Sequence, residues 1–396
     1  MRVREIRCTP VTVPMVGPLL WSMGVEVGTT RTIIELETDD GVIGLGETYG
    51  GRATVSVVDF LRPYIVGMDV DEPERLYRIV QSFRISYETS VPMHVLGGLE
   101  MALLDAAGKA RGRSVSTLLG GTFRSHIPCS AYMFFRRTGS AGAAAIATPE
   151  DMQDATASEI ESHGFATVKV KTGVLPPRED VRTMRLLRDR YPELKLRCDP
   201  NAAWSVETSL RYLPALRELD MEFVEDPTDG LDAMARVRRA VAVPLATNMC
   251  VIEFGHLPTA VRLGSVDIIL ADVHYWGGPR ATLKLAAIAE TFRLGLGMHS
   301  DRELGISTAA QLHVAAAIPT LSYAIDTHYL QQADDVITQP FQFHDGGLDV
   351  PDGPGLGVEL DPHKVQYYHE YYERSGDVVE FGDPTRPDWV PVLPLF

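Results

Sequence analysis

The pattern of apolar and polar residues changes at about residue 125. Before that point, apolar and polar residues alternate in residues 3–15 and on both sides of the Asp39-Asp40-Gly41 turn, which predicts three strands with one hairpin. Apolar residues then recur at three- and four-residue steps in VSVVDFLRPYIVG and MHVLGGLEMALLDAAGKARG, which predicts two helices. We therefore expect the first part of the chain to form an α+β unit.

Beyond residue 125, short apolar runs recur about every 20 to 30 residues and helical patterns fill most of the intervals. The runs are ATVKV, LKLRC, MEFVE, VPLAT, DIILA, LGLGM and LSYAI, and the clearest helical segments are DVRTMRLLRDRYP, SVETSLRYLPALREL, LDAMARVRRAV and RATLKLAAIAETFRL. Alternating strands and helices predict a parallel sheet. Seven units without a GxGxxG after the first strand favour a closed barrel over an open sheet.

The predicted fold class is thus α/β, a (β/α)7–8 TIM-like barrel with an N-terminal α+β capping domain that the C-terminal tail completes. We expect the capping domain at residues 1–125 and the catalytic barrel at residues 126–335. Residues 336–396, rich in Gly, Pro and Asp, are expected to return to the capping domain.

Composition restricts the possible partners. The formal net charge of −16 argues against nucleic acid or an anionic membrane as a partner. No run of 18 apolar residues predicts a membrane span, and the N-terminus lacks the apolar stretch of a secretory signal. The four cysteines are scattered without a CxxC pair, so we expect neither disulfides nor a zinc site. These features together predict a cytoplasmic protein.

Each apolar run of the predicted barrel ends with a polar residue. In chain order these are Lys171, with Lys169 inside the run, then Asp199, with Asn201 just beyond, Glu225, Asn248, Asp272, His299 and Asp326. The carboxyl ends of barrel strands share one face, and barrel active sites lie there. Seven consecutive polar strand ends therefore predict a functional site.

Three of these residues suggest a metal site. Asp199, Glu225 and Asn248 follow three adjacent predicted strands and offer only hard oxygen ligands. Each alone would usually be a helix cap or a turn residue. As a group they suit Mg²⁺, which takes a few protein ligands and leaves positions for substrate oxygens.

The remaining strand ends suggest acid–base chemistry. Lys169 and Lys171 point to the same side of one strand, and two like charges in a barrel mouth are costly unless function or a counter-ion keeps them. Asp272 can orient His299 and raise its basicity, as in a general base or acid. Ser300 raises the question of a nucleophile, but without a GxSxG elbow nucleophilic hydrolysis is not favoured.

These groups fit removal of a proton next to a carboxylate. That proton is weakly acidic, and its loss creates an enediolate whose charge a metal ion can stabilise in the transition state. Either Lys171 or His299 could be the base.

Six motifs make the chain resemble the enolase superfamily, mandelate racemase type, and within it the glucarate dehydratase group. They are VKVKTGVL, RCDPNAAW, FVEDP, PLATNMC, ADVHYWGG and GMHS, and the resemblance spans nearly the whole chain. It implies Lys171 as base with Lys169 as its neighbour, Asn201 in the active site and an Asp272–His299 dyad. It also implies Asp199, Glu225 and Asn248 as Mg²⁺ ligands, with Asn248 the most diagnostic of the group.

The resemblance also implies substrate contacts. Tyr132 in SAYMFF and Asp326 in AIDTHYLQ match positions that contact substrate. The family's substrate-specificity loop corresponds to about residues 16–30, which here carry Leu19, Leu20 and Trp21 and no His. The family's C-terminal Arg for the distal carboxylate has no clear counterpart. We therefore do not expect glucarate to be the preferred substrate, and we add Trp21, Arg136 and Ser300 as substrate-binding candidates.

The sequence thus predicts a lyase: a Mg²⁺-dependent acid-sugar dehydratase that converts a small carboxylate substrate into a 2-keto-3-deoxy acid. A racemase or epimerase of a 2-hydroxy acid in the same superfamily is the first alternative. A non-catalytic metal- or ligand-binding paralogue is the alternative of another class, against which the intact Lys171, His299 and Asp272 argue. A homo-oligomer is expected.

Overall fold

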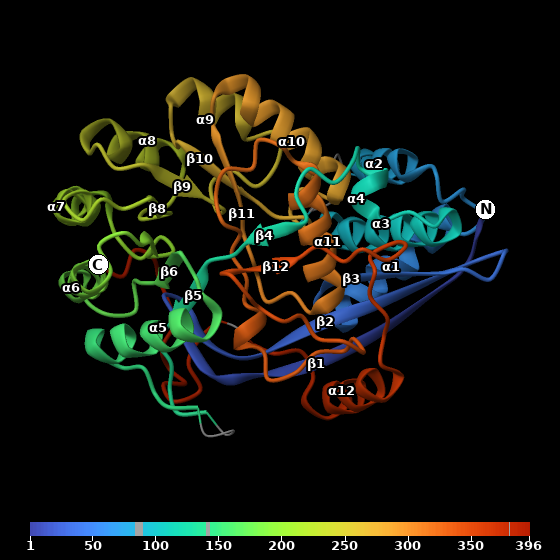
Figure 1. Cartoon of the computed structure of the whole chain (residues 1–396), viewed down its shortest axis with the longest axis horizontal. Coiled ribbons are helices and arrows are strands. Elements are labelled where there is room, and N and C mark those ends of the chain that lie inside the picture. The colour runs from blue at the N-terminus through green and yellow to red at the C-terminus, as the bar shows by residue number, and fades with distance from the viewer. Residues whose placement is uncertain (84–89, 140–142, 380) are drawn as a thin grey trace.

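The computed structural model describes residues 1–83, 90–139, 143–379 and 381–396 and divides into a strand-and-helix layer and a barrel (Figure 1). The first layer is an antiparallel sheet in the order β1-β2-β3, followed by four helices. Its elements are β1 (Val3–Trp21), β2 (Gly24–Thr38), β3 (Ile43–Tyr49), α1 (Arg52–Ile65), α2 (Pro73–Ser82), α3 (Ser90–Arg111) and α4 (Val115–Leu118). The predicted hairpin turn before β3 is confirmed, with Gly41 at a φ of 80°.

The first part of the chain differs from the prediction in one respect: residues 16–30 do not form a loop. β1 continues to Trp21 and pairs with β2 through Leu20 and Val25, so a hairpin turns at residues 22–23. The pairing shifts register between Pro14 and Leu19, a stretch that contains Pro18, which has no N–H to donate. Beyond this irregular stretch β1 and β2 pair again, and the burial of Leu19 and Val25 stabilises that second stretch of pairing.

The barrel confirms the predicted alternation of strands and helices. Seven parallel strands follow the spatial order β11-β10-β9-β8-β7-β6-β5, and the helices cover their outer side (Figure 1). The strands are β5 (Ala131–Phe134), β6 (Thr167–Lys171), β7 (Lys195–Asp199), β8 (Phe223–Glu225), β9 (Leu245–Thr247), β10 (Ile268–Ala271) and β11 (Gly295–Met298). The helices are α5 (Pro149–His163), α6 (Pro177–Arg190), α7 (Val206–Arg217), α8 (Leu231–Ala240), α9 (Leu257–Leu263), α10 (Pro279–Phe292) and α11 (Gly305–Ala317).

The prediction of a strand at LSYAI was wrong, although the segment still closes the barrel. A bend at Tyr323 leaves only the end of the run extended, where Ile325 forms an isolated bridge with Cys129. The Asp326 N–H donates to the Met298 carbonyl at 3.0 Å, and the Ser130 N–H donates to the Ile325 carbonyl at 2.9 Å. This segment therefore joins β11 to the start of β5.

The last part of the chain contacts both layers. The 3₁₀ helix Tyr329–Gln331 precedes β12 (Gly347–Asp349), which pairs antiparallel with β4 (His126–Pro128). Helix α12 (Pro362–Ser375), which the sequence analysis did not predict, lies against β1, where His369 Nδ1 is 2.7 Å from the Pro10 carbonyl (Figure 1). Residues 381–396 then pass the β1–β2 turn and end at the β7–α7 connection, where the Phe396 N–H donates to Ala203. In the part of the chain that the structure describes, none of the helices has both the length and the apolar character that crossing a membrane requires.

Candidate active site

The predicted strand-end residues gather around one cavity of about 210 Å³ at the carboxyl ends of the barrel strands, beside the tip of the β1–β2 hairpin. Seven predicted site residues line it: Trp21, Tyr132, Lys171, Asn201, Asn248, His299 and Ser300. The other predicted barrel residues are buried next to these side chains, with the exception of Arg136. One cavity therefore receives side chains from the capping sheet and from several barrel strands.

Lys169 is the centre of a buried charge cluster. Its Nζ lies 2.5 Å from Glu225 Oε2, 2.8 Å from Asp326 Oδ2 and 3.4 Å from Asp199 Oδ2. Burial disfavours the charged amine, but the surrounding carboxylates outweigh it and raise the pKa of Lys169 well above its ordinary value. Lys169 is therefore a fixed cation that neutralises part of the negative charge of this site.

Lys171, two residues further along β6, faces the cavity instead. Its Nζ donates to Asp199 Oδ2 at 2.7 Å and to the Tyr132 hydroxyl at 3.3 Å. The two lysines share Asp199, whose pKa is held below its usual value because their charges outweigh the effect of burial. Lys171 therefore presents an amine to a bound molecule from a position set by two neighbours.

The three predicted metal ligands fit a hard divalent cation. Glu225 Oε1 and Asn248 Oδ1 are buried and accept no hydrogen bond from the residues that the structure describes. Burial first, and then the nearby Asp199, raise the pKa of Glu225 to about 8, although Lys169 and Lys171 oppose them; the cluster sets the three acids Asp199, Glu225 and Asp326 against these two lysines. Unpaired oxygens together with surplus negative charge are what a Mg²⁺ site requires.

Asp272 and His299 form a hydrogen-bonded dyad. His299 Nδ1 lies 3.0 Å from Asp272 Oδ2, while Asp272 Oδ1 accepts the backbone N–H groups of His274 and Tyr275. Burial disfavours the carboxylate, but the imidazoles of His274 and His299 outweigh it and hold the pKa of Asp272 well below its ordinary value. Burial opposes the imidazolium, but Asp272 raises the pKa of His299 overall. Nε2 of His299 is then the nitrogen available to a molecule in the cavity.

The sequence analysis missed residues from the capping sheet that support this dyad. The Tyr49 hydroxyl donates to Asp272 Oδ2 at 3.0 Å, and the guanidinium of Arg31 lies 3.9 Å from the centre of the Tyr49 ring. Burial and the nearby Asp272 raise the pKa of Tyr49, so its hydroxyl keeps its proton. The sequence signal for this contact is weak: it consists of two charged residues, Arg31 and Glu47, inside predicted strands, and the structure shows both to be buried.

Part of the cavity lining is apolar. These walls include Trp21, whose ring centroid lies 5.5 Å from that of Phe381, together with Met23, Phe134 and Met249. Arg302 also lines it, but its guanidinium donates twice to Asp301, at 2.6 and 2.9 Å, and lies 3.9 Å from Glu26. Two carboxylates therefore already surround this cation.

Two further candidates have other surroundings than expected, and a third lines the cavity. Asp326 is fully buried, pairs with Lys169 and Arg197, and does not line the cavity. The predicted direct contact between Asp326 and a substrate therefore does not fit its position. Arg136 lies beside a neighbouring cavity and donates to the Ala144 carbonyl, because it extends past the end of β5. The Ser300 hydroxyl, by contrast, lines the main cavity and lies 2.9 Å from His328 Nδ1.

Comparisons with known proteins agree with this architecture. Residues 3–120 match the family model of the mandelate racemase / muconate lactonizing enzyme N-terminal domain, and residues 151–364 match the enolase C-terminal domain-like model. A Streptomyces coelicolor protein named probable glucarate dehydratase is 38% identical, over 98% of this chain and 97% of that protein. Muconate cycloisomerase 1 of Rhodococcus opacus is 28% identical, over 92% of this chain and 98% of that protein. The crystal structure of an enolase from Pseudomonas fluorescens with bound magnesium, potassium and tartrate has a TM-score of 0.92 at 35% identity and covers 100% of this chain and 99% of its own.

Proposed function

Since the chain belongs to the enolase superfamily, with the domains of mandelate racemase and muconate lactonizing enzyme, we propose that it is a Mg²⁺-dependent acid-sugar dehydratase. One observation carries the proposal: Lys171 and the Asp272–His299 dyad meet at a cavity that also exposes the Asn248 side chain. An acid–base pair beside unpaired oxygen ligands suits proton abstraction next to a carboxylate. The similarity to a probable glucarate dehydratase supports the same chemistry.

Asp199, Glu225 and Asn248 are the residues that would hold Mg²⁺. When bound, Mg²⁺ would supply positive charge at the substrate carboxylate as that group gains charge in the transition state. Lys169 adds a fixed positive charge among the same carboxylates. Magnesium in the Pseudomonas fluorescens relative supports this assignment.

The chain's own residues would move two protons. Lys171 or His299 takes the proton from C2, and the electron pair of that C–H bond forms a double bond to C3 as the C3 hydroxyl leaves. His299, whose pKa Asp272 raises, donates the proton that turns the departing hydroxyl into water. The resulting enol then tautomerises to the 2-keto-3-deoxy acid, so the reaction needs no oxidant.

The lining of the cavity favours an acid sugar with an uncharged distal end. Trp21, Met23 and Phe381 offer a second carboxylate no hydrogen-bond partner of opposite charge, and the lining cation Arg302 is already paired with Asp301 and Glu26. An unpaired charge in such surroundings is costly. We therefore propose aldonates over glucarate and other diacids.

The test is a screen of the purified protein with Mg²⁺ against aldonates and aldarates, read by formation of 2-keto acids. We expect turnover of at least one aldonate, and loss of that turnover in the Lys171→Met and His299→Asn variants. Silence across the library would contradict dehydration. A diacid as the best substrate would contradict only the substrate class.

Epimerisation is a second candidate because Lys171 on β6 and His299 after β11 approach one cavity from different strands. One could remove the proton and the other return it to the opposite face. Incubation in D₂O distinguishes the two reactions, since an epimerase incorporates deuterium at C2 without forming a 2-keto acid. The similarity to muconate cycloisomerase favours neither reaction, because that protein's name indicates a cycloisomerisation and neither an epimerisation nor a dehydration.

A further inference from the structure

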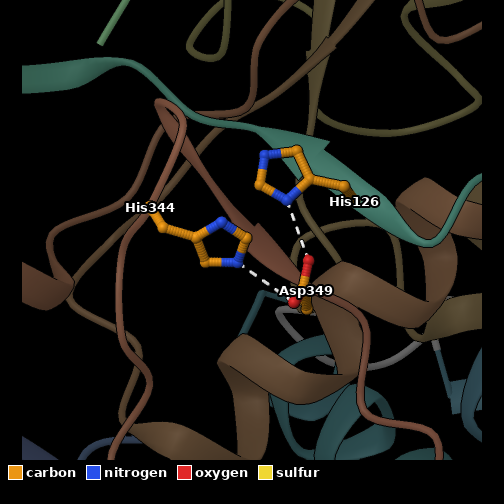
Figure 2. Close-up of side chains that lie close together, drawn as sticks. All are labelled: His126, His344 and Asp349. Atoms are coloured by element: carbon orange, nitrogen blue, oxygen red, sulfur yellow. Dashed lines mark hydrogen bonds and ion pairs between the residues drawn. The ribbon is translucent and has the colours of Figure 1, made fainter. Parts of the chain in front are cut away.

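A second group of potential ligands lies on the β4–β12 ribbon, outside the cavity described above. His126 of β4 pairs directly opposite Asp349 of β12, and His344 precedes the turn that leads into β12. Figure 2 shows the three side chains close together, with one dashed line from each imidazole to the Asp349 carboxylate. His126 Nδ1 lies 2.9 Å from Asp349 Oδ1, and His344 Nε2 lies 3.0 Å from Asp349 Oδ2.

The backbone fixes this arrangement. The N–H and carbonyl groups of His344 and Gly347 bond to each other at 3.1 and 2.9 Å, across a turn whose central residues, Asp345 and Gly346, both have positive φ. A Cβ at position 347 would lie 2.6 Å from His126 Nε2, so the absence of a side chain there makes room for the imidazole. Nε2 of His126 is buried against Gly347, which leaves Nδ1 as its ligand atom.

We propose that His126, His344 and Asp349 form a binding site for a divalent transition-metal ion such as Zn²⁺ or Ni²⁺. One ligand atom from each residue lies within 4.8 Å of the others. Around a tetrahedral ion with Zn–N bonds of about 2.0–2.1 Å, neighbouring ligand atoms are about 3.3 Å apart, so small side-chain movements suffice. Two imidazole nitrogens with one carboxylate select such ions over Mg²⁺ and Ca²⁺.

The surroundings of His344 support the assignment. Its Nδ1 lies 3.3 Å from Asp345 Oδ2, so a carboxylate contacts the ring nitrogen opposite the proposed ligand atom. Metal-bound histidines commonly donate that second N–H to a carboxylate, which fixes the ring orientation. The side chains of His344 and Asp349 remain 49% and 66% exposed, which leaves room for water to complete the coordination.

A bound ion would tie the start of the barrel to the C-terminal segment. β4 leads into β5, the strand that carries Tyr132, whereas β12 comes after the last barrel helix, α11, in the chain. Because the ligands come from both strands of the ribbon, the ion would bind the folded chain more tightly than the unfolded chain and so raise its stability.

The test is calorimetric titration of the untagged full-length protein with Ni²⁺ in excess Mg²⁺, which keeps the active-site ligands occupied. The variants are His344→Ala and Asp349→Asn, and the matched control is His363→Ala, an exposed histidine at the start of α12. We expect the wild type and His363→Ala to bind one more Ni²⁺ than His344→Ala. Asp349→Asn should bind this ion at least tenfold more weakly.

A second readout is the thermal midpoint in Ni²⁺. It should rise for the wild type and for His363→Ala and stay constant for His344→Ala. Circular dichroism checks that each variant is folded, as expected for exposed side chains. Equal Ni²⁺ stoichiometry in the wild type and His344→Ala would overturn the proposal, and so would an unchanged wild-type midpoint. Neither result depends on the proposed dehydratase activity.

Discussion

At the scale of single residues, the Tyr49 hydroxyl is the most informative contact that the sequence analysis missed. It shares Asp272 Oδ2 with His299, so Asp272 is oriented from the capping sheet as well as from the barrel. Tyr49→Phe removes one hydrogen bond to a charged group, a contribution of about 1.5–3 kcal/mol. We expect kcat to fall about tenfold while KM stays within about twofold, because Tyr49 does not line the cavity.

The same variant should alter the pH profile of kcat. With one hydrogen-bond donor fewer, the Asp272 carboxylate interacts more strongly with His299 and raises the pKa of His299 further. The limb of the kcat profile that reports the titration of His299 should therefore move to higher pH. Tyr367→Phe, at an exposed position on α12, is the control. A profile identical to that of the wild type would show that Tyr49 has only a packing role.

Asn248 is the residue whose amide oxygen most directly tests the metal assignment. Asn248→Ala removes a buried oxygen that has no other partner among the described residues. Even residues that only orient metal ligands contribute about 10–100-fold to affinity, so we expect Mg²⁺ binding to weaken at least tenfold. Calorimetric titration with Mg²⁺ measures this without substrate, and Tyr367→Phe, at an exposed position on α12, serves as the control. Unchanged affinity would remove Asn248 from the ligand set.

At the scale of elements, the sequence predicted those features that depend on local periodicity. The barrel strands and their polar ends follow from short apolar runs at regular spacing, and so the dyad and the candidate metal ligands could be located before the fold was known. The LSYAI run carries the same local signal but forms only a bridge, since its pairing depends on how β11 and β5 approach each other. The end of the β1–β2 hairpin likewise depends on packing against the barrel, where Met15 and Leu19 contact Tyr132 and Phe134 of β5.

The contacts that could not be predicted join residues far apart in the chain. Tyr49 and Asp272 are separated by 223 residues, and Arg31 reaches carbonyl groups 270 residues away. No periodicity records such a pairing, because it arises when the capping sheet docks on the barrel. Arg136 shows the opposite error: it follows Tyr132 closely in the sequence, yet the chain leaves the cavity at the end of β5.

Glu100 offers a test of the contact between helices α3 and α10. Burial raises its pKa to about 7, partly opposed by Arg280, whose backbone N–H donates to Glu100 Oε2 at 3.2 Å. Between the ordinary pKa of 4.5 and about 7, the folded protein keeps a proton that the unfolded chain releases, so stability falls as pH rises through this range. Above pH 7 the buried carboxylate therefore destabilises the fold.

Glu100→Gln keeps an acceptor for the Arg280 N–H and stays neutral. We expect it to raise the free energy of unfolding by about 1–3 kcal/mol at pH 8, with the difference vanishing near pH 4, as measured by urea denaturation at both pH values. Glu74→Gln, at an exposed side chain that also contacts Arg280, should change stability by less than about 0.5 kcal/mol. An equal gain at both pH values would contradict the explanation.

At the scale of the whole molecule, one buried ion pair connects the two layers. Arg31 of β2 and Glu47 of β3 are fully buried with 3.4 Å between Nε and Oε1. Glu47 accepts the backbone N–H groups of Leu304 and Ser307 at the start of α11, each at 2.9 Å, and Arg31 donates to the Arg302 carbonyl at 3.2 Å. The capping sheet thus supplies partners for the segment that follows His299.

This geometry leads to a prediction for the pair as a unit. Arg31→Met preserves much of the side-chain volume but leaves Glu47 as an uncompensated buried charge, which typically costs about 3–5 kcal/mol. The Arg31→Met/Glu47→Gln variant removes both charges, so we expect it to be more stable than Arg31→Met alone. Urea denaturation of the wild type, both single variants and the double variant measures the coupling energy directly. Additive losses would mean that the two residues stabilise their own strands independently, and that docking of the capping sheet on α11 does not depend on their pairing.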